Sequence, residues 1–222
     1  MHTFHIGLLA AMPEELGKIE NNLYSKRYIK YGDLEIISGI WKGSNSEKKI
    51  FITAAWSGWG KVSAARATTR LINLKFEEKK IDFFVFCGVA GGAQNYLKQW
   101  DVIISDSSIQ HDMDARPIFE KYVIPAIGKK IMKSNNFLTK EVFQTLINSK
   151  EKKNLKKFGK IYKGLIATGD QFISDKKIIE KLSAQFPDLL AVEMEGSAFA
   201  QVANQEGVDW IIIRTISDSA DH

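Results

Sequence analysis

Residues 81–92 read IDFFVFCGVAGG, a continuous apolar run that ends in a cluster of glycines. Apolar residues at successive positions, instead of at every second one, are typical of a strand that is covered on both faces. The run therefore predicts a central strand of a sheet flanked by helices. Because glycines let backbone amides approach a ligand closely, the end of this strand is a candidate binding site.

Similar apolar runs recur along the chain, and amphipathic stretches lie between them. Strands are predicted within residues 4–11, 34–41, 49–56, 81–91, 101–106, 164–170, 189–194 and 209–218, and helices within residues 13–23, 61–76, 137–149, 175–186 and 195–207. Asp175 is the expected N-cap of the fourth helix, and Gly207 is the expected stop of the last. The alternation predicts a three-layer α/β/α fold with a central mixed, mostly parallel sheet. A hairpin near residues 30–55 is expected to add antiparallel strands.

The composition is that of one globular domain over residues 1–222, with 45% hydrophobic residues and a single cysteine. One cysteine excludes an internal disulfide and a cysteine-cluster metal site, and it favours a reducing compartment, so we expect a cytoplasmic location. No apolar run reaches the roughly 20 residues that span a bilayer. The opening residues lack a basic leader. We therefore expect no membrane association.

The formal net charge of +5 raises the question of nucleic-acid binding. Much of the excess lies in SKEKKNLKKFGKIYKG, residues 149–164, which we call the lysine-rich segment. Lysines this dense usually form a solvated face, and arginine, the better reader of phosphates and bases, is scarce. We therefore expect no nucleic-acid partner.

Several short patterns have a functional and a structural interpretation. The glycines of CGVAGG do not have the G-x-G-x-x-G spacing of a dinucleotide loop. His111, Asp112 and Asp114 resemble a metal cluster, but no further histidine or cysteine lies at ligand spacing, so a surface loop is favoured and no metal is expected. Glu193 and Glu195 stand where an apolar run ends, and carboxylates beside a core are costly unless paired or used.

Read in order, six motifs resemble the nucleoside phosphorylase and nucleosidase superfamily, most nearly its bacterial 5′-methylthioadenosine/S-adenosylhomocysteine nucleosidases. The motifs are AAMPEEL, SGWGKVSAA, CGVAGG, TGDQFI, AVEMEGSAFAQVA and IIIRTISDSAD. The resemblance implies a nucleoside phosphorylase-like fold and hydrolysis of the N-glycosidic bond of those two nucleosides, releasing adenine and the thioribose. It also implies that no cofactor is used and that the chain forms a homodimer, with the region of DARPIF at the dimer contact.

The resemblance also implies roles for individual residues. Asp218 would be the general acid that protonates purine N7, oriented by Ser217. Glu15 would activate water, although the residues alone leave Glu14 and Glu15 open as ordinary first-turn glutamates. Glu195 would hold the ribose hydroxyls, with Met194 packed against the ribose and the thioether.

The same resemblance assigns the remaining walls of the substrate site. Phe172 and Ile173 would recognise adenine, and Trp59 would line the pocket near the 5′ substituent, where relatives often carry an aliphatic residue. Val89, Ala90, Gly91, Glu193 and Arg214 complete the substrate-binding set, with Glu193 in a supporting position. Relatives often have a hydroxyl residue at the position of Val89. They also continue with a further helix after ISDSAD, so we expect that the chain lacks this helix or that one wall is supplied differently.

Other functions remain open on the sequence. A purine nucleoside phosphorylase is the nearest alternative, but phosphate capture needs cationic groups, and the first loop, AMPEE, is acidic. A nucleosidase for futalosine or another adenosine-type compound is a second alternative. A catalytically silent nucleoside binder is a third, and the joint presence of Glu15, Glu195 and Asp218 argues against it.

Overall fold

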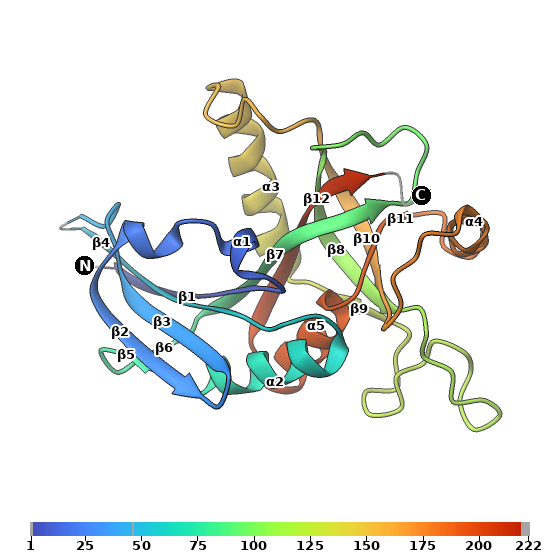
Figure 1. The fold of residues 1–222 in the computed structure, drawn as a ribbon, viewed down its shortest axis with the longest axis horizontal. Coiled ribbons are helices and arrows are strands. Elements are labelled where there is room, and N and C mark those ends of the chain that lie inside the picture. Colours follow the sequence, from blue (N-terminus) through green and yellow to red (C-terminus); the bar gives the residue numbers. More distant parts are fainter. Residues whose placement is uncertain (1, 46, 219–222) are drawn as a thin grey trace.

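The computed structural model describes residues 2–45 and 47–218, and for Asp218 the backbone alone. A ten-stranded mixed sheet forms its centre, with strand order β11-β10-β8-β12-β7-β1-β4-β3-β2 and β9 paired to β8 (Figure 1). Its strands are β1 His2–Ala10, β2 Leu23–Tyr31, β3 Leu34–Trp41, β4 Lys48–Trp56, β7 Phe83–Gly92, β8 Val102–Gln110, β9 Ile131–Lys133, β10 Ile161–Thr168, β11 Leu189–Glu193 and β12 Asp209–Asp218. A separate small hairpin joins β5 Lys75–Phe76 to β6 Lys79–Lys80. The predicted α/β fold with a central mixed sheet is confirmed.

The sequence stretch 81–92 supplies β7, which lies at the centre of this arrangement. β7 runs parallel to β1 on one side and to β12 on the other. Its last residues also pair with β11 in antiparallel fashion, Gly91 with Val192 and Gly92 with Ala191. Because β11 also pairs with β10, the strands β7, β12, β8, β10 and β11 close into a ring. The last two glycines of β7 therefore belong to the pairing between β7 and β11 that closes the ring.

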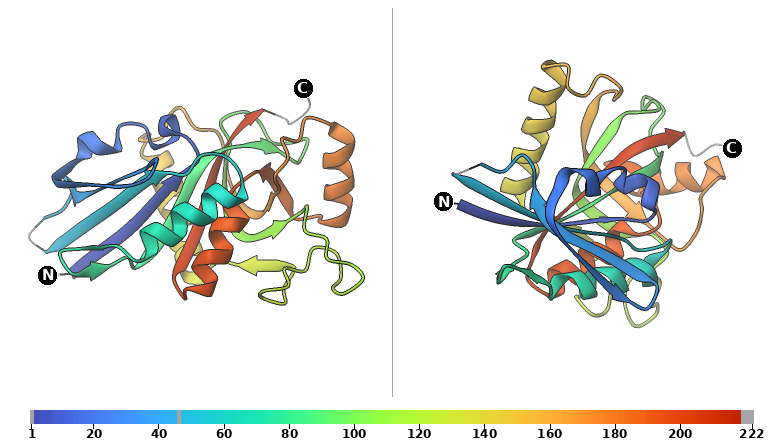
Figure 2. Two further views of the ribbon diagram at one scale, coloured as in Figure 1. Left: turned by 60° about the horizontal axis from the view of Figure 1, so that its bottom comes forward. Right: turned by 60° about the vertical axis from the view of Figure 1, so that its left-hand side comes forward.

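Helices cover both faces of the strands, as the continuous apolar runs predict. The long helices are α2 Lys61–Ile72, α3 Asn136–Glu151, α4 Lys176–Gln185 and α5 Gly196–Gln205. Neighbouring residues of β12 point to opposite sides: Ile211 packs in the cluster that includes residues of α3, and Ile212 in the cluster with α2 and α5. α2 and α5 lie side by side on their face (Figure 2).

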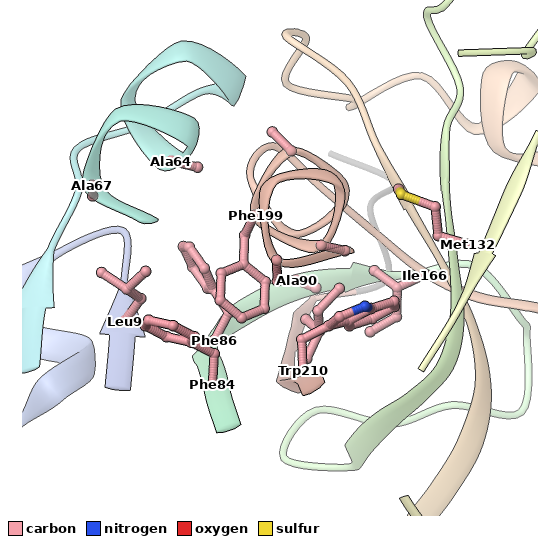
Figure 3. Packing of buried hydrophobic residues seen from close by; sticks show 14 of the residues in the cluster. Leu9, Ala64, Ala67, Phe84, Phe86, Ala90, Met132, Ile166, Phe199 and Trp210 are labelled. Carbon is pink, nitrogen blue, oxygen red and sulfur yellow. The ribbon is translucent and has the colours of Figure 1, made fainter. Parts of the chain in front are cut away.

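Aromatic side chains fill the core between β7 and α5. Phe199 of α5 packs edge-on against Phe84 and Phe86 of β7, with ring centroids 6.0 and 5.2 Å apart (Figure 3). Trp210 of β12 is 1% exposed and belongs to the same cluster. Such edge-to-face pairs stabilise a core beyond the apolar area that they bury. This packing fixes α5, and with it the turn that precedes α5, against the sheet.

The structure departs from the sequence prediction over residues 13–23. We expected one helix there, but the chain forms a single turn, α1 Pro13–Leu16, then the 3₁₀ helix η1 Ile19–Asn22, and then enters β2. Gly17 interrupts the helix with a φ of 57°, a conformation that glycine adopts without strain. The expected helix ends are confirmed elsewhere: the Asp175 side chain accepts a hydrogen bond from the Lys177 N–H, and Gly207 has a φ of 69°.

Candidate active site

A pocket opens where β1, β7, β11 and β12 end, and most of the sequence-predicted site residues line it. The pocket is open to solvent, and its empty space is about 700 Å³ when the open mouth is included. Its lining residues are Ala11, Met12, Glu15, Trp59, Val89, Ala90, Gly91, Gln171, Phe172, Ile173, Val192, Glu193, Met194, Glu195 and Ser217. Segments far apart in the sequence thus meet at one end of the sheet.

Glu15 is held in the pocket by backbone N–H groups. Its Oε2 accepts from Ala11 at 2.8 Å and from Met12 at 3.0 Å, as a glutamate at the third position of a helix does when it bends back to the helix start. Its Oε1 accepts from the Val89 N–H at 2.9 Å. Glu14 is exposed and does not line the pocket. The geometry therefore singles out Glu15 where the residues alone left both glutamates open.

Gly88 allows the β7 backbone to come this close to Glu15. A Cβ at Gly88 would lie 2.5 Å from Glu15 Oε1 and 2.2 Å from Arg214 Nη1, both shorter than real contacts. Only a residue without a side chain fits between the carboxylate and the guanidinium. Gly88 therefore serves close packing of the site's charged groups.

Glu193 is saturated by donors from the protein. Its carboxylate accepts from the N–H groups of Glu195 and Gly196, from the Thr168 hydroxyl, and from the Arg214 guanidinium. The side chain of Glu193 is only 2% exposed. A carboxylate with so many protein partners has little capacity left for a ligand, which agrees with the supporting position expected for Glu193.

Glu195 has far fewer partners. Its Oε1 accepts one hydrogen bond, at 2.9 Å, from the Gly60 N–H, and its Oε2 lies 3.5 Å from Arg214 Nη2. Burial, and then the charge of Glu193, raise the pKa of Glu195 to about 7, although Arg214 opposes the shift. Of the two glutamates in VEMEG, Glu195 therefore has the carboxylate available to accept hydrogen bonds from a ligand.

Arg214 is the cation that this cluster of glutamates surrounds. It is fully buried on β12, with its guanidinium carbon 4.7 Å from the centre of the Phe86 ring. Burial alone would lower its pKa, but the charges of Glu193, Glu195 and Glu15 outweigh that effect and raise it. Arg214 does not line the pocket, so its expected direct contact with substrate is not supported. The structure instead makes it the counter-charge that lets the carboxylates share one buried site.

Apolar and aromatic side chains form the outer part of the pocket. Trp59 is 64% exposed and Phe172 is 75% exposed, although both line the cavity. Ile173 is buried at 7% exposure, and Met194 is half-buried. Large exposed aromatic rings at a pocket mouth gain most when a ligand covers them. The sequence interpretation that Phe172 is a site residue and not a core residue agrees with its exposure.

The end of β12 forms another part of the wall. Ser217 lines the pocket, and its hydroxyl donates to the Ala90 carbonyl at 3.3 Å. The backbone of Asp218 pairs with Gly91, whose neighbours Ala90 and Val89 also line the cavity. The side chain of Asp218, and hence its expected role as an acid, lies outside the described residues. Its backbone position is at the pocket wall.

Sequence reasoning missed four lining residues: Ala11, Met12, Gln171 and Val192. Gln171 and Val192 adjoin residues that were identified, and Ala11 and Met12 belong to the motif AAMPEEL that contains Glu15, so proximity in the sequence was the available signal. It also missed the Gly60 N–H that holds Glu195, for which no sequence signal existed. His111 is buried at 8% exposure, unlike the surface-loop residue expected. Asp112 and Asp114, taken as whole residues with their backbone, are exposed. Among the side chains that the structure describes, in residues 2–45 and 47–217, no group of three or more histidine, cysteine or carboxylate side chains could hold a metal ion.

Comparison with known proteins gives consistent matches over nearly the whole chain. The family model of the phosphorylase superfamily matches residues 5–222. A 5′-methylthioadenosine/S-adenosylhomocysteine nucleosidase of Shewanella denitrificans is 34% identical over 219 residues, which cover 98% of this chain and 87% of that protein.

None of the described helices is long and apolar enough to cross a membrane.

Solved structures agree with the sequence matches. The S-adenosylhomocysteine nucleosidase of Streptococcus pyogenes, in complex with 5-methylthiotubericidin, superposes with a TM-score of 0.83 at 29% identity, covering 100% of this chain and 86% of that one. The futalosine hydrolase of Helicobacter pylori superposes with a TM-score of 0.78 at 31% identity, covering 98% and 86%.

Proposed function

The chain belongs to the phosphorylase superfamily, and on that basis we propose that it hydrolyses the N-glycosidic bond of 5′-methylthioadenosine and S-adenosylhomocysteine. The products are adenine and the corresponding thioribose. The name of the Shewanella relative and the nucleoside analogue bound to the Streptococcus structure support this choice of substrates. As an N-glycosyl hydrolase, the chain would need an acid for the base, a polar group for the ribose and a base for water.

In the proposed mechanism, each of these tasks falls to one carboxyl group. The C1′–N9 bond breaks with its electron pair going to adenine, and Asp218 gives a proton to N7. Glu195 accepts hydrogen bonds from the ribose hydroxyls and stabilises the positive charge that develops on the sugar. Water attacks C1′, and Glu15 takes the proton that the water loses. Three backbone N–H groups hold the Glu15 carboxylate in one orientation, which suits a positioned base.

The charges of the pocket favour water over phosphate as the acceptor. Phosphorolysis requires cationic groups that hold phosphate. Among the lining residues that the structure describes there is no lysine or arginine, and Arg214 behind them is engaged by glutamates. A phosphate dianion would therefore meet carboxylates without a free counter-charge.

The observation that carries the proposal is the meeting of Glu15 and Glu195 in one pocket with Met194, Phe172 and Ser217. These residues come from four separate motifs that the sequence resemblance had selected. A catalytically silent binder would have no need of a water-activating carboxylate beside the ribose-binding one.

Adenine release from 5′-methylthioadenosine tests the proposal. We expect Glu15→Gln and Asp218→Asn each to lower kcat by about 10² or more, the usual contribution of a positioned acid or base. Glu14→Gln, one residue away on the exposed side of the turn, is the matched control and should keep the wild-type rate. Equal rates in all four proteins would reject the assignment, and a dependence on added phosphate would favour the phosphorylase.

A nucleosidase for futalosine is the second candidate, because the Helicobacter pylori futalosine hydrolase has the same fold and identity level as the other relatives. The 5′ substituent is one difference between these substrates, and the exposed ring of Trp59 is expected to lie beside it. Ranking kcat/KM for futalosine, 5′-methylthioadenosine and S-adenosylhomocysteine on one enzyme preparation distinguishes the two candidates.

We further propose that the chain acts as a homodimer in the cytoplasm. Exposed apolar residues on the segment after β8, Ile118 at 82% and Phe119 at 38% exposure, support a contact there. Light scattering on the purified protein measures the mass, and a monomer at micromolar concentration would contradict the dimer.

A further inference from the structure

A closed ring of hydrogen bonds joins three segments beside the pocket. Asp112 follows β8, Lys61 begins α2, and Asp170 lies in the loop after β10. Asp112 Oδ1 accepts from Lys61 Nζ at 2.7 Å, and Asp112 Oδ2 accepts from the Asp170 N–H at 2.9 Å. Asp170 Oδ1 in turn accepts from the Lys61 N–H at 2.7 Å. Each residue of the ring contacts both of the others, and we call this ring the loop clamp.

The three residues of the loop clamp do not line the pocket, but they connect two segments that do. On one side, Lys61 follows Trp59 and Gly60, and the Gly60 N–H donates to Glu195 Oε1 at 2.9 Å. On the other side, Asp170 precedes Gln171, Phe172 and Ile173, all of which line the cavity. The clamp therefore joins the segment that contacts the ribose-binding carboxylate to the segment that carries the adenine-side residues.

Two features indicate that these segments need such a restraint. Gly58 and Gly60 flank Trp59 with φ angles of 83° and 89°, so the backbone on both sides of Trp59 has the conformational freedom of glycine. Residues 169–175 between β10 and α4 belong to no helix or strand. A Cβ at Gly60 would lie 3.0 Å from Asp170 Oδ1, so the clamp also brings the Asp170 side chain into close contact with the backbone at Gly60.

The electrostatics of Asp112 fit this role. Burial alone would raise its pKa, but the hydrogen bonds from Lys61 and from the Asp170 N–H outweigh it and lower the pKa. The side chains of Lys61 and Asp112 are 18% and 29% exposed, so solvent screens the pair only in part. Lys61 Nζ is also 3.4 Å from Gln110 Oε1, and Gln110 Nε2 donates to Gln201 of α5 at 2.8 Å, which anchors the clamp to the core.

We propose that Asp112 is a positioning residue for nucleoside binding, acting through Lys61 and Asp170 to set the spacing between residues 57–61 and 169–173. The identity of the nucleoside rests on the proposed function, but the clamp itself does not. Asp112 touches no substrate, and its loss should weaken the ground-state fit of ribose and adenine more than it slows the chemical step.

Kinetics of Asp112→Asn provide the first test. The asparagine keeps the shape but loses the charge that Lys61 requires, so KM should rise about tenfold, equivalent to about 1.4 kcal/mol, with kcat changed by less than about threefold. The matched control is Glu77→Gln, which removes the 2.6 Å ion pair with Lys49 at the amino-terminal end of β4, away from the pocket. The control should keep the wild-type KM. An unchanged KM in Asp112→Asn would overturn the proposal.

A double-mutant cycle separates a clamp from independent effects. If Lys61 and Asp112 act as one unit, Lys61→Met combined with Asp112→Asn should raise KM no more than either change alone. If the increase in KM of the double variant equals the product of the increases in the two single variants, the residues act separately, which would contradict the clamp.

Hydrogen–deuterium exchange tests the clamp without any activity measurement. In Asp112→Asn, amides in both 57–61 and 169–173 should exchange about tenfold faster than in the wild type, while amides of α3 should exchange at the wild-type rate. In the Glu77→Gln control, the amides of both segments should exchange at the wild-type rate. Unchanged exchange in the two segments would refute the clamp even if the protein hydrolyses nucleosides. If the wild-type protein hydrolysed no nucleoside but Asp112→Asn still exchanged faster in the two segments, the proposed function would be rejected and the clamp would be retained.

Discussion

Two charge-dense regions of this chain behave in opposite ways. Where β11 ends and α5 begins, Glu193 and Glu195 as whole residues are 8% and 5% exposed, and their side chains lie beside a fully buried arginine. In the lysine-rich segment, residues 149–164, most lysines are exposed and have no acidic partner among the described contacts. The density of charge is similar, but only the first region lies in a cavity. Water screens the second region, so its charges do little to each other or to the fold.

The comparison teaches that burial, not charge density, decides where a charge can do chemistry. In the turn, each charge depends on its neighbours, because one missing partner leaves a buried ion without compensation. In the lysine-rich segment, each lysine is independent of the next. Substitutions in the two regions should therefore differ greatly in effect.

The largest effect is expected at Arg214. Arg214→Met removes the only cation near Glu193 and Glu195 within the described cluster and should lower the free energy of unfolding by about 3–5 kcal/mol, the usual loss when one partner of a buried pair is deleted. Urea denaturation at pH 7 measures this change. Arg214→Lys keeps the charge and should recover part of the loss. If Arg214→Met were as stable as wild type, the buried cluster would not be coupled as described.

A smaller effect, with a distinctive pH dependence, is expected at Glu195. Its pKa is about 7 in the folded protein and near 4.5 in the unfolded chain, so ionisation disfavours the folded state. The stability that the protonated form contributes is complete below pH 4.5 and is lost as pH rises through 7. Glu195→Gln cannot ionise. Its free energy of unfolding relative to wild type should therefore rise by about 3 kcal/mol between pH 4.5 and pH 8.

Denaturation curves of both proteins at the two pH values check this prediction. Other titrating groups are common to the two proteins and cancel in the difference. A difference that is constant with pH would mean that Glu195 titrates normally, and Glu195 would then resemble the exposed charges of the lysine-rich segment.

The smallest effects are expected within the lysine-rich segment, where one lysine should differ from the others. Lys150 Nζ donates to the Phe158 carbonyl at 2.7 Å and also to the Gly159 carbonyl, so Lys150→Met should cost about 1 kcal/mol. Lys156 is exposed, and Lys156→Met removes the same charge without these bonds. That variant should stay within about 0.5 kcal/mol of wild type, as surface substitutions do. Equal losses in thermal unfolding would show that net charge, not hydrogen bonding, decides the effect.

Much of the fold could be predicted from the sequence because its central strands are continuous apolar runs. The edge strand β2 could not, because Leu23–Tyr31 is mostly charged and polar and only Leu23 is buried. The predicted helix over residues 13–23 overlaps β2 only at Leu23, and within that stretch nothing but Gly17 signalled a break. A polar edge strand is chosen by its pairing with β3, a tertiary contact that the local sequence does not contain.

For the site, the residues alone identified the segments, and only the family resemblance divided the tasks within them. Without it, the sequence could not tell Glu193 from Glu195, because the donors that saturate Glu193 come from Thr168 and Arg214 as well as from its own turn. It assigned Arg214 to the substrate, whereas the structure places it behind the pocket wall. It could not find the loop clamp at all, because the partners of Asp112 are 51 and 58 residues away along the chain.

The place of β12 in the sheet sets the order in which this protein can mature during synthesis. Residues 209–218 insert between β7 and β8, strands that leave the ribosome about a hundred residues earlier. Until they arrive, the two edges that β12 will join stay unpaired, a state that favours association with chaperones or with other nascent chains. Arg214 arrives on the same strand, so the nascent chain holds its acidic residues without their counter-ion until the final strand is in place.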